Sequence, residues 1–214
     1  KQGSEAALKP SGGLNTLVVR ASGNTFGLAA NDTPIANVID DTFQAGRVGL
    51  FVEAPAMVQF DNLRVTSLAG DGGAGADLPP SGAKVLFTDD FTTNTGWATD
   101  EFRSVQDGRL VLHNQGEHRS FLSWNPITKG YTDFVAQVDA TQLKGDGKVL
   151  YGLCWRVDDG EHFYFFLLNS GGSYYAGVRN GDDISVLRKG QQPAVRNQPQ
   201  ANTLEVRAAG REFK

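Results

Sequence analysis

The two ends of this chain repeat each other. Residues 1–27 align without a gap against residues 188–214, at a constant offset of 187 positions. The clearest matching stretches, Asn-Thr-Leu-Val-Val-Arg-Ala-Ser-Gly and Asn-Thr-Leu-Glu-Val-Arg-Ala-Ala-Gly, begin at Asn15 and Asn202. A period of this length exceeds the roughly 20 to 50 residues of a solenoid repeat and has the size of a domain plus a linker. The sequence therefore predicts the back half of one domain followed by the front half of the next copy.

Residues 69–84 mark the boundary between the two halves. This segment is rich in glycine and contains Pro79-Pro80 near its end, a composition typical of a flexible linker with one stiffened end. We expect residues 1–68 to be the C-terminal half of one sandwich repeat and residues 85–214 to be the N-terminal part of the next.

Three arrangements follow from these boundaries. The chain is an excerpt of a longer tandem array, a subunit of a polymer in which copies share strands, or a self-closed circular permutant. In the self-closed arrangement residues 1–68 pack back onto the front half. The two repeated segments then compete for one place in a sheet, and we expect one of them to be left as an unpaired strand.

Composition excludes several classes of partner. The chain is 40% hydrophobic and 21% charged, with a formal net charge of −4. It shows no basic patch of the kind that binds nucleic acid, and no apolar run approaches the roughly 20 residues of a membrane span. Cys154 is the single cysteine, so no internal disulfide can form. We expect no nucleic-acid partner and no membrane span.

Strand signals fill the chain. Short runs rich in β-branched and aromatic residues alternate with turn residues, which is typical of an antiparallel sandwich or barrel. Phe134, Ala136, Val138 and Ala140 alternate with polar residues and indicate one core-facing side. The run Phe163–Leu168 does not alternate, so it must be covered on both faces, by a second sheet and by loops, a ligand or a partner. The expected strands are 16–21, 26–30, 47–52, 58–65, 109–113, 134–140, 149–157, 163–168, 174–179 and 184–187.

Three motifs carry a family resemblance. Val85–Phe91, Gly46–Leu50 (Gly-Arg-Val-Gly-Leu) and Phe60–Val65 (Phe-Asp-Asn-Leu-Arg-Val) resemble bacterial concanavalin A-like lectin/glucanase domains. These laminin-G-like modules are also described as glycoside hydrolase family 16-like or 3-keto-disaccharide hydrolase-like. The resemblance implies an all-β, antiparallel two-sheet jelly-roll sandwich, here split across a tandem repeat because the closing part precedes the opening part. Since this fold hosts hydrolases, lectins and adhesins, the resemblance does not fix a function.

The carboxylates argue against catalysis. Glycoside hydrolysis needs two acids that flank the scissile bond. Family 16 enzymes carry them as Glu-x-Asp-x-x-Glu on one strand, and this chain has no such run. We therefore predict no catalytic residues and no required cofactor. We expect a non-catalytic, extracellular or cell-surface module with a structural, adhesive or surface-array role, whose partners are other copies of itself that share strands. The alternatives are a lectin-like carbohydrate-binding module and a glycoside hydrolase-like enzyme.

Two candidate sites remain. In the order of the family's domain, Asp61 belongs to the closing strand, at 58–65, and Asp89 and Asp90 belong to the opening strand, at 85–91. These acids come together if the two strands lie side by side. Their oxygens then suit Ca²⁺, which takes six to eight oxygen ligands; the alternative is that these acids cap turns. Aromatic rings with a few polar groups suit the apolar faces of sugars, or else form ordinary sheet core. The candidate ligand-binding residues of this second site are Tyr151, Trp155, Arg156, Tyr164 and Phe166.

Overall fold

The protein is built from β-strands. The computed structural model describes residues 15–30, 33–68, 83–116, 119–126, 130–191 and 201–208, so most of the expected linker at 69–84 lies outside the described residues. The described residues form strands, turns and loops without a helix, which confirms the all-β prediction. This part of the chain accordingly offers no apolar helix of bilayer-crossing length. The strands are β1 (Asn15–Ser22), β2 (Thr25–Ala30), β3 (Thr33–Ile39), β4 (Arg47–Glu53), β5 (Ala56–Thr66), β6 (Val85–Asp89), β7 (Arg103–Gln106), β8 (Arg109–Asn114), β9 (Ser120–Trp124), β10 (Phe134–Lys144), β11 (Tyr151–Val157), β12 (His162–Leu168), β13 (Ser173–Asn180), β14 (Asp183–Gln191) and β15 (Ala201–Ala208).

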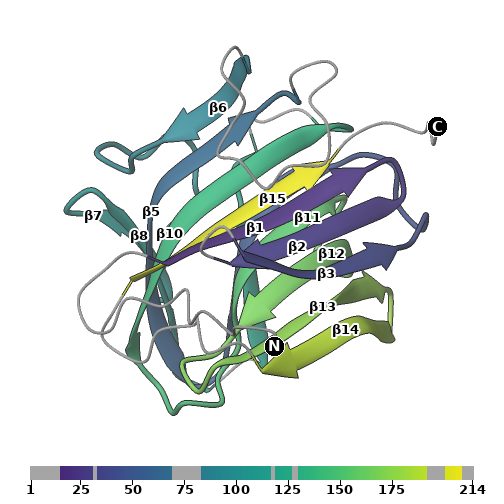
Figure 1. The fold of residues 1–214 in the computed structure, drawn as a ribbon. Helices are drawn as coiled ribbons and strands as arrows, with labels where there is room; N and C mark the ends of the chain where they lie inside the picture. The colour runs from purple at the N-terminus through teal and green to yellow at the C-terminus, as the bar shows by residue number, and fades with distance from the viewer. Residues whose placement is uncertain are drawn as a thin grey trace.

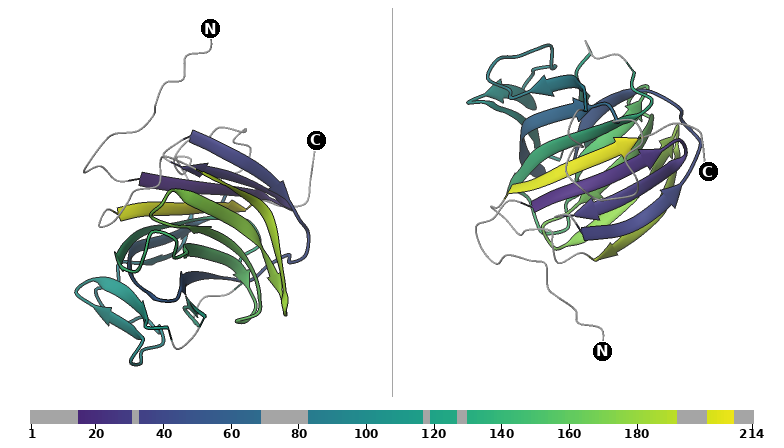
Figure 2. Two further views of the ribbon diagram at one scale, coloured as in Figure 1. Left: turned by 90° about the horizontal axis from the view of Figure 1, so that it is seen from below. Right: turned by 45° about the horizontal axis from the view of Figure 1, so that its top comes forward.

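The strands form two stacked sheets. The large sheet has nine strands in the order β3-β2-β1-β15-β10-β5-β8-β7, with β6 also paired to β5, and the small sheet has six in the order β14-β13-β12-β11-β4-β9. Figures 1 and 2 show the two layers, with the large sheet in front of the small one in Figure 1. Apart from β1 and β15, the paired strands of the described chain run antiparallel. The fold is thus the expected antiparallel two-sheet sandwich.

Both halves of the chain contribute to each sheet. In the large sheet β5, from residues 15–68, pairs with β10, from residues 83–208, and Val65 lies opposite Ala136. In the small sheet β4 pairs with β11, and Leu50 lies opposite Leu153. The two halves of a single chain therefore pair with each other in both sheets.

The two repeated segments lie side by side in the large sheet. β15 is antiparallel to β10, and β1 is parallel to β15 with Leu17 opposite Leu204. Figure 1 shows the yellow β15 between the purple β1 and the green β10. The expectation that self-closure leaves one repeat unpaired is wrong, because the sheet becomes one strand wider and takes both.

The core lies between the sheets and joins the two halves. The alternating residues Phe134, Ala136, Val138 and Ala140 are all fully buried, as their spacing predicts. Aromatic rings meet across the halves: Phe26 lies 4.8 Å from Tyr164, which stacks on Trp155 at 5.5 Å and 17° between ring planes. Such ring pairs stabilise the fold beyond the free energy gained by burying their apolar surface.

A β-bulge turns Arg156 toward the loops of the first half. The register of β11 against β4 shifts between Cys154 and Val157, and Arg156 has a φ of 49°. Bulges of this kind redirect a side chain. The guanidinium donates hydrogen bonds to the carbonyl oxygens of Phe43 (2.6 Å), Gly23 (2.9 Å) and Thr132 (3.2 Å). Burial lowers the pKa of Arg156, while Tyr164 and Asp133 oppose that shift.

Gly46 is required beside this bulge. A Cβ atom added to Gly46 would lie 2.3 Å from the carbonyl carbon of Arg156, well inside any real contact distance. Gly46 is also hydrogen-bonded to Tyr131 through both backbone groups. The first glycine of the Gly-Arg-Val-Gly-Leu motif therefore permits a close approach of two backbones.

We predict that Arg156→Met destabilises the fold. The substitution keeps the length of the side chain but leaves three carbonyl acceptors without their charged donor. Because removing a buried charge offsets part of this loss, the free energy of unfolding should fall by about 2–4 kcal/mol. Urea denaturation measures the change, with Arg64→Met on the exposed face of β5 as the control. Equal stability of the two variants would contradict the structural role of Arg156.

A second prediction concerns pH. Tyr164 donates a 2.6 Å hydrogen bond to Asp40 and accepts one from the Phe43 amide. Burial alone would raise the pKa of Asp40, but hydrogen bonds from Thr42 and Tyr164 bring it below its usual value. A carboxyl with a depressed pKa stabilises the fold above its unfolded pKa, near 4, and loses that contribution as pH falls further.

Tyr164→Phe should therefore lower the free energy of unfolding by about 1 kcal/mol at pH 7, allowing for the solvent exposure of Asp40. The difference from the wild-type chain should shrink below pH 4. Urea titrations at pH 7 and pH 3 measure it; a difference that grows in acid would count against this hydrogen bond.

Candidate functional site

The candidate site lies on the outer face of the small sheet, the face turned away from the large sheet. Phe163, Phe165 and Leu167 of β12 point to this face and belong to a separate apolar cluster, whereas Tyr164 and Phe166 point into the core. All residues from 163 to 168 are at most 6% exposed. The non-alternating run is therefore buried on both faces, as its sequence predicts.

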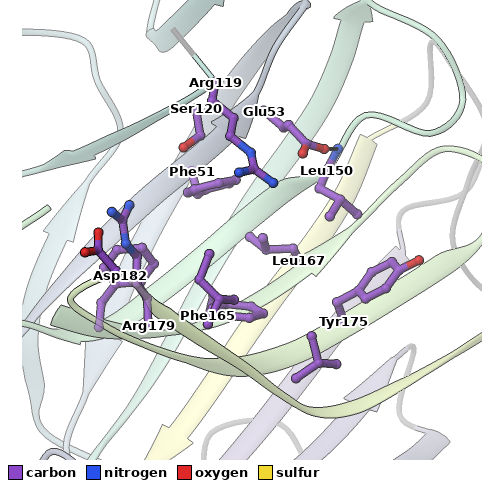
Figure 3. Close-up of a pocket in the computed structure, with 13 residues that line it drawn as sticks. Phe51, Glu53, Arg119, Ser120, Leu150, Phe165, Leu167, Tyr175, Arg179 and Asp182 are labelled. Atoms are coloured by element: carbon purple, nitrogen blue, oxygen red, sulfur yellow. Dashed lines mark hydrogen bonds between the residues drawn. The ribbon is translucent and has the colours of Figure 1, made fainter. Parts of the chain in front are cut away.

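A pocket with a volume of about 640 Å³ opens on this outer face. Figure 3 shows apolar side chains at its centre, with charged side chains around them. Pockets of roughly 300–1,000 Å³ with apolar walls and a few polar groups are typical of small-molecule sites. The lining residues are Phe51, Glu53, Arg119, Ser120, Leu150, Phe163, Phe165, Leu167, Tyr175, Arg179, Asp182, Ile184 and Val186.

Charged groups stand at two ends of the pocket. Glu53 accepts a 3.3 Å hydrogen bond from the Leu150 amide, and Arg119 lies beside it (Figure 3). At the other end Arg179 donates to the Gly181 carbonyl oxygen at 3.0 Å, near Asp182. Within the described chain Arg119 and Asp182 form no ion pair. Each end therefore presents a charged group that a ligand can engage.

The carboxylates of the pocket do not have a glycosidase arrangement. Glu53 belongs to β4 and Asp182 to the turn between β13 and β14, and these are the acidic residues that line the pocket. β11 and β12 separate β4 from β13, so the two strands are about 14 Å apart at three interstrand steps. Paired catalytic carboxylates lie only about 5–9.5 Å apart. The geometry suits hydrogen bonding to a ligand better than paired acid–base chemistry.

The candidate ligand residues predicted from the sequence lie on the opposite side of the same strands. Tyr151, Trp155, Tyr164 and Phe166 belong to the core between the sheets, and Arg156 is buried among loop carbonyls. All five are at most 2% exposed, so a ligand reaches them only if the sandwich opens. The structure thus gives them the core role that the sequence left as the alternative.

Sequence reasoning missed the residues that do line the pocket. Phe51, Arg119, Tyr175 and Asp182 come from four separate elements, and no motif connects them. The one available signal was the apolar run at 163–168, whose outer half forms the pocket floor.

The three acids proposed for Ca²⁺ do lie near the paired strands β5 and β6, where Leu63 is opposite Asp89. However, no group of three or more His, Cys, Asp or Glu side chains in the described chain is arranged to hold a metal. Asp89 is 4% exposed and accepts hydrogen bonds from the Phe91 amide (2.8 Å), Thr95 (2.5 Å) and Trp97 (2.8 Å). These oxygens are already used, so the residues present do not fit a calcium ion.

Asp90 and Asp61 have local roles instead. Asp90 accepts hydrogen bonds from the amide and hydroxyl of Thr92, which lower its pKa. Asp61 accepts one from the Asn62 amide; burial raises its pKa, and the charges of Asp139 and Asp90 add to that shift. Asp90 therefore caps a turn, as the alternative interpretation held, whereas Asp61 lies within β5 at a register shift against β10.

We predict that Asp89→Asn destabilises the chain and Asp90→Asn does not. The amide introduced by Asp89→Asn would turn an NH₂ group toward one of the N–H or O–H groups that now donate a hydrogen bond to the carboxylate. The free energy of unfolding should fall by about 1–3 kcal/mol. Asp90 is exposed, so its substitution should leave the free energy of unfolding nearly unchanged. Thermal melts measure both. A rise in melting temperature with millimolar Ca²⁺ that Asp89→Asn abolishes would contradict the hydrogen-bonding role.

No protein-family model, curated protein or solved structure matches this chain significantly.

Proposed function

We propose that this chain is a non-catalytic, carbohydrate-binding module that acts in adhesion, with its ligand in the pocket on the outer face of the small sheet. The observation that carries the proposal is the pocket itself. Its floor is apolar and aromatic, and its ends carry Arg119 and Asp182, which form no ion pair within the described chain, whereas Arg179 pairs with Glu161 at 3.3 Å.

The pocket matches the chemistry of a sugar. A pyranose ring has an apolar face of C–H groups, which packs on aromatic side chains, and hydroxyl groups, which need both donors and acceptors. Phe51 and Tyr175 are half-buried and supply the rings. Arg119 supplies donors, and Asp182 supplies acceptors, at separate ends of the floor. A neutral ligand with hydroxyl groups at both ends can hydrogen-bond to Arg119 and Asp182, which are exposed and keep part of their hydration.

The fold and the sequence add support. The two-sheet sandwich is the architecture that the resemblance to concanavalin A-like domains implies, and that group includes lectins and adhesins. The wide separation of Glu53 and Asp182 favours binding over hydrolysis. An extracellular or cell-surface location follows from this role as part of the same proposal.

A glycan array followed by calorimetry tests the proposal. The intact chain should bind a defined glycan saturably, and Arg119→Ala and Tyr175→Ala should each weaken binding at least tenfold, about 1.4 kcal/mol. Tyr175→Phe keeps the ring and should retain most of the affinity. Arg64→Ala, on the exposed face of β5 in the large sheet, is the control for Arg119→Ala.

Two results would overturn the proposal. The first is a failure of the binding test. Either Arg119→Ala and Tyr175→Ala leave the affinity for the glycan unchanged, or the chain binds no glycan while its melting temperature shows an intact fold. The second is hydrolysis of a glucan that Glu53→Gln abolishes, since that outcome identifies an enzyme.

A further inference from the structure

β1 and β15 occupy neighbouring positions with the same residue at nearly every step. The parallel register joins Asn15 to Asn202 and continues without interruption to Arg20 and Arg207, which is the offset of the sequence repeat. Over the paired residues the two strands differ only where Val18 lies opposite Glu205. Any position in the sheet that accepts one strand therefore accepts the other in the same register.

The position for which the two repeated strands are alternatives is the one beside β10. β15 now fills it, with Leu204 opposite Val138 and Val206 opposite Ala136. If β15 left, β1 could pair with β10 through the equivalent residues Leu17 and Val19. The sheet would then run β3-β2-β1-β10-β5, with antiparallel pairing throughout. The exchange also removes the one parallel pairing of the described sheets, a type slightly less stable per residue than antiparallel pairing.

β1 is tied to the rest of the molecule independently of β15. The β1–β2 turn is held by the hydrogen bond from Arg156 to the Gly23 carbonyl oxygen at 2.9 Å, and Phe26 of β2 is 1% exposed in the core. Arg156 also holds Phe43, which follows β3. Because Thr25 pairs with Ile39, both contacts lie at the same end of the three-stranded ribbon of β1, β2 and β3, and the ribbon is held there while its other end can swing toward β10. β1 therefore stays connected to the core when β15 leaves.

We propose that β15 is an exchange strand whose partner is a second copy of this chain. When β15 leaves, β1 closes the position beside β10, so the chain keeps a complete sheet. A free strand with this pattern of residues is suited to pair with another chain. In a second copy whose own β15 has left, the incoming β15 displaces β1 from the position beside β10 and takes it in the native register, and reciprocal exchange of β15 links the two copies.

Engineered disulfides in the full chain test the first step. Gln137 lies opposite Glu205, and Val18 lies beyond Glu205, about 9–10 Å from Gln137 at two interstrand steps. A disulfide needs Cα atoms within about 7 Å. Val18→Cys with Gln137→Cys should therefore cross-link little in the parent chain. Adding Val206→Pro, which cannot be accommodated in a central strand, should expel β15 and make cross-linking nearly complete.

The control pair is Gln137→Cys with Glu205→Cys, which should cross-link in the chain that retains Val206. The native Cys154 does not interfere, because it is buried and burial raises the pKa of its thiol well above the usual value. The proposal is overturned if the Val206→Pro chain loses its cooperative unfolding, or if it stays folded without a disulfide between positions 18 and 137.

The second step is tested by mixing two single variants, Gln137→Cys and Glu205→Cys, each otherwise intact. Incubation a few degrees below the melting temperature, followed by oxidation, should give a disulfide-linked dimer that contains one chain of each kind. Neither variant alone should give it. If no mixed dimer forms while the double variant cross-links within one chain, β15 does not exchange between copies and the proposal fails.

Discussion

Two antiparallel strand pairs hold the molecule together, β5 with β10 and β4 with β11. Each joins a strand of the first half of the chain to a strand of the second, one pair in each sheet. Hydrogen-bonded pairing fixes the register, and the register fixes which side chains meet. The pairing of β4 with β11 places Phe51 and Glu53 on the outer face and Leu50 in the core. Both the core and the candidate site therefore require strands that lie far apart in the sequence.

Most strands could be predicted from sequence because their residues are constrained on at least one face. The ten expected runs all fall on observed strands, with ends that differ by a few residues. The turn at Asp107-Gly108 was also correct, and its positive φ values of 52° and 69° are those of a tight hairpin. Of the strands outside those ten runs, β3, β7 and β9 lie at the ends of their sheets, β6 pairs with β5, and β15 was expected only as the repeat of β1. An edge strand pairs on one side only, and its sequence is correspondingly less restricted.

The site was harder to predict than the fold. Side chains alternate between the two faces of a strand, but the sequence does not say which face meets the second sheet. In β12 both faces are apolar, so periodicity gave no reason to prefer Phe163 and Phe165 over Tyr164 and Phe166 as ligand residues. Only the placement of the large sheet decides that the even-numbered residues form the core. The polar groups of the pocket come from other strands and from a turn, so their convergence is a tertiary property.

The repeat and the pocket belong to different sheets, and this separation has a consequence for assembly. β15 and its neighbours β1 and β10 lie in the large sheet, whereas the pocket is lined by strands and loops that belong to or flank the small sheet. In linked copies a β15 strand again pairs with β10, so β1 and the loops that Arg156 holds at Gly23 and Phe43 keep their places. Exchange of β15 therefore leaves the outer face of the small sheet intact. Linked copies would each retain a pocket, and several weak sites on one assembly bind a multivalent surface far more tightly than one site does. If both proposals hold, the chain combines recognition with avidity, as adhesion requires.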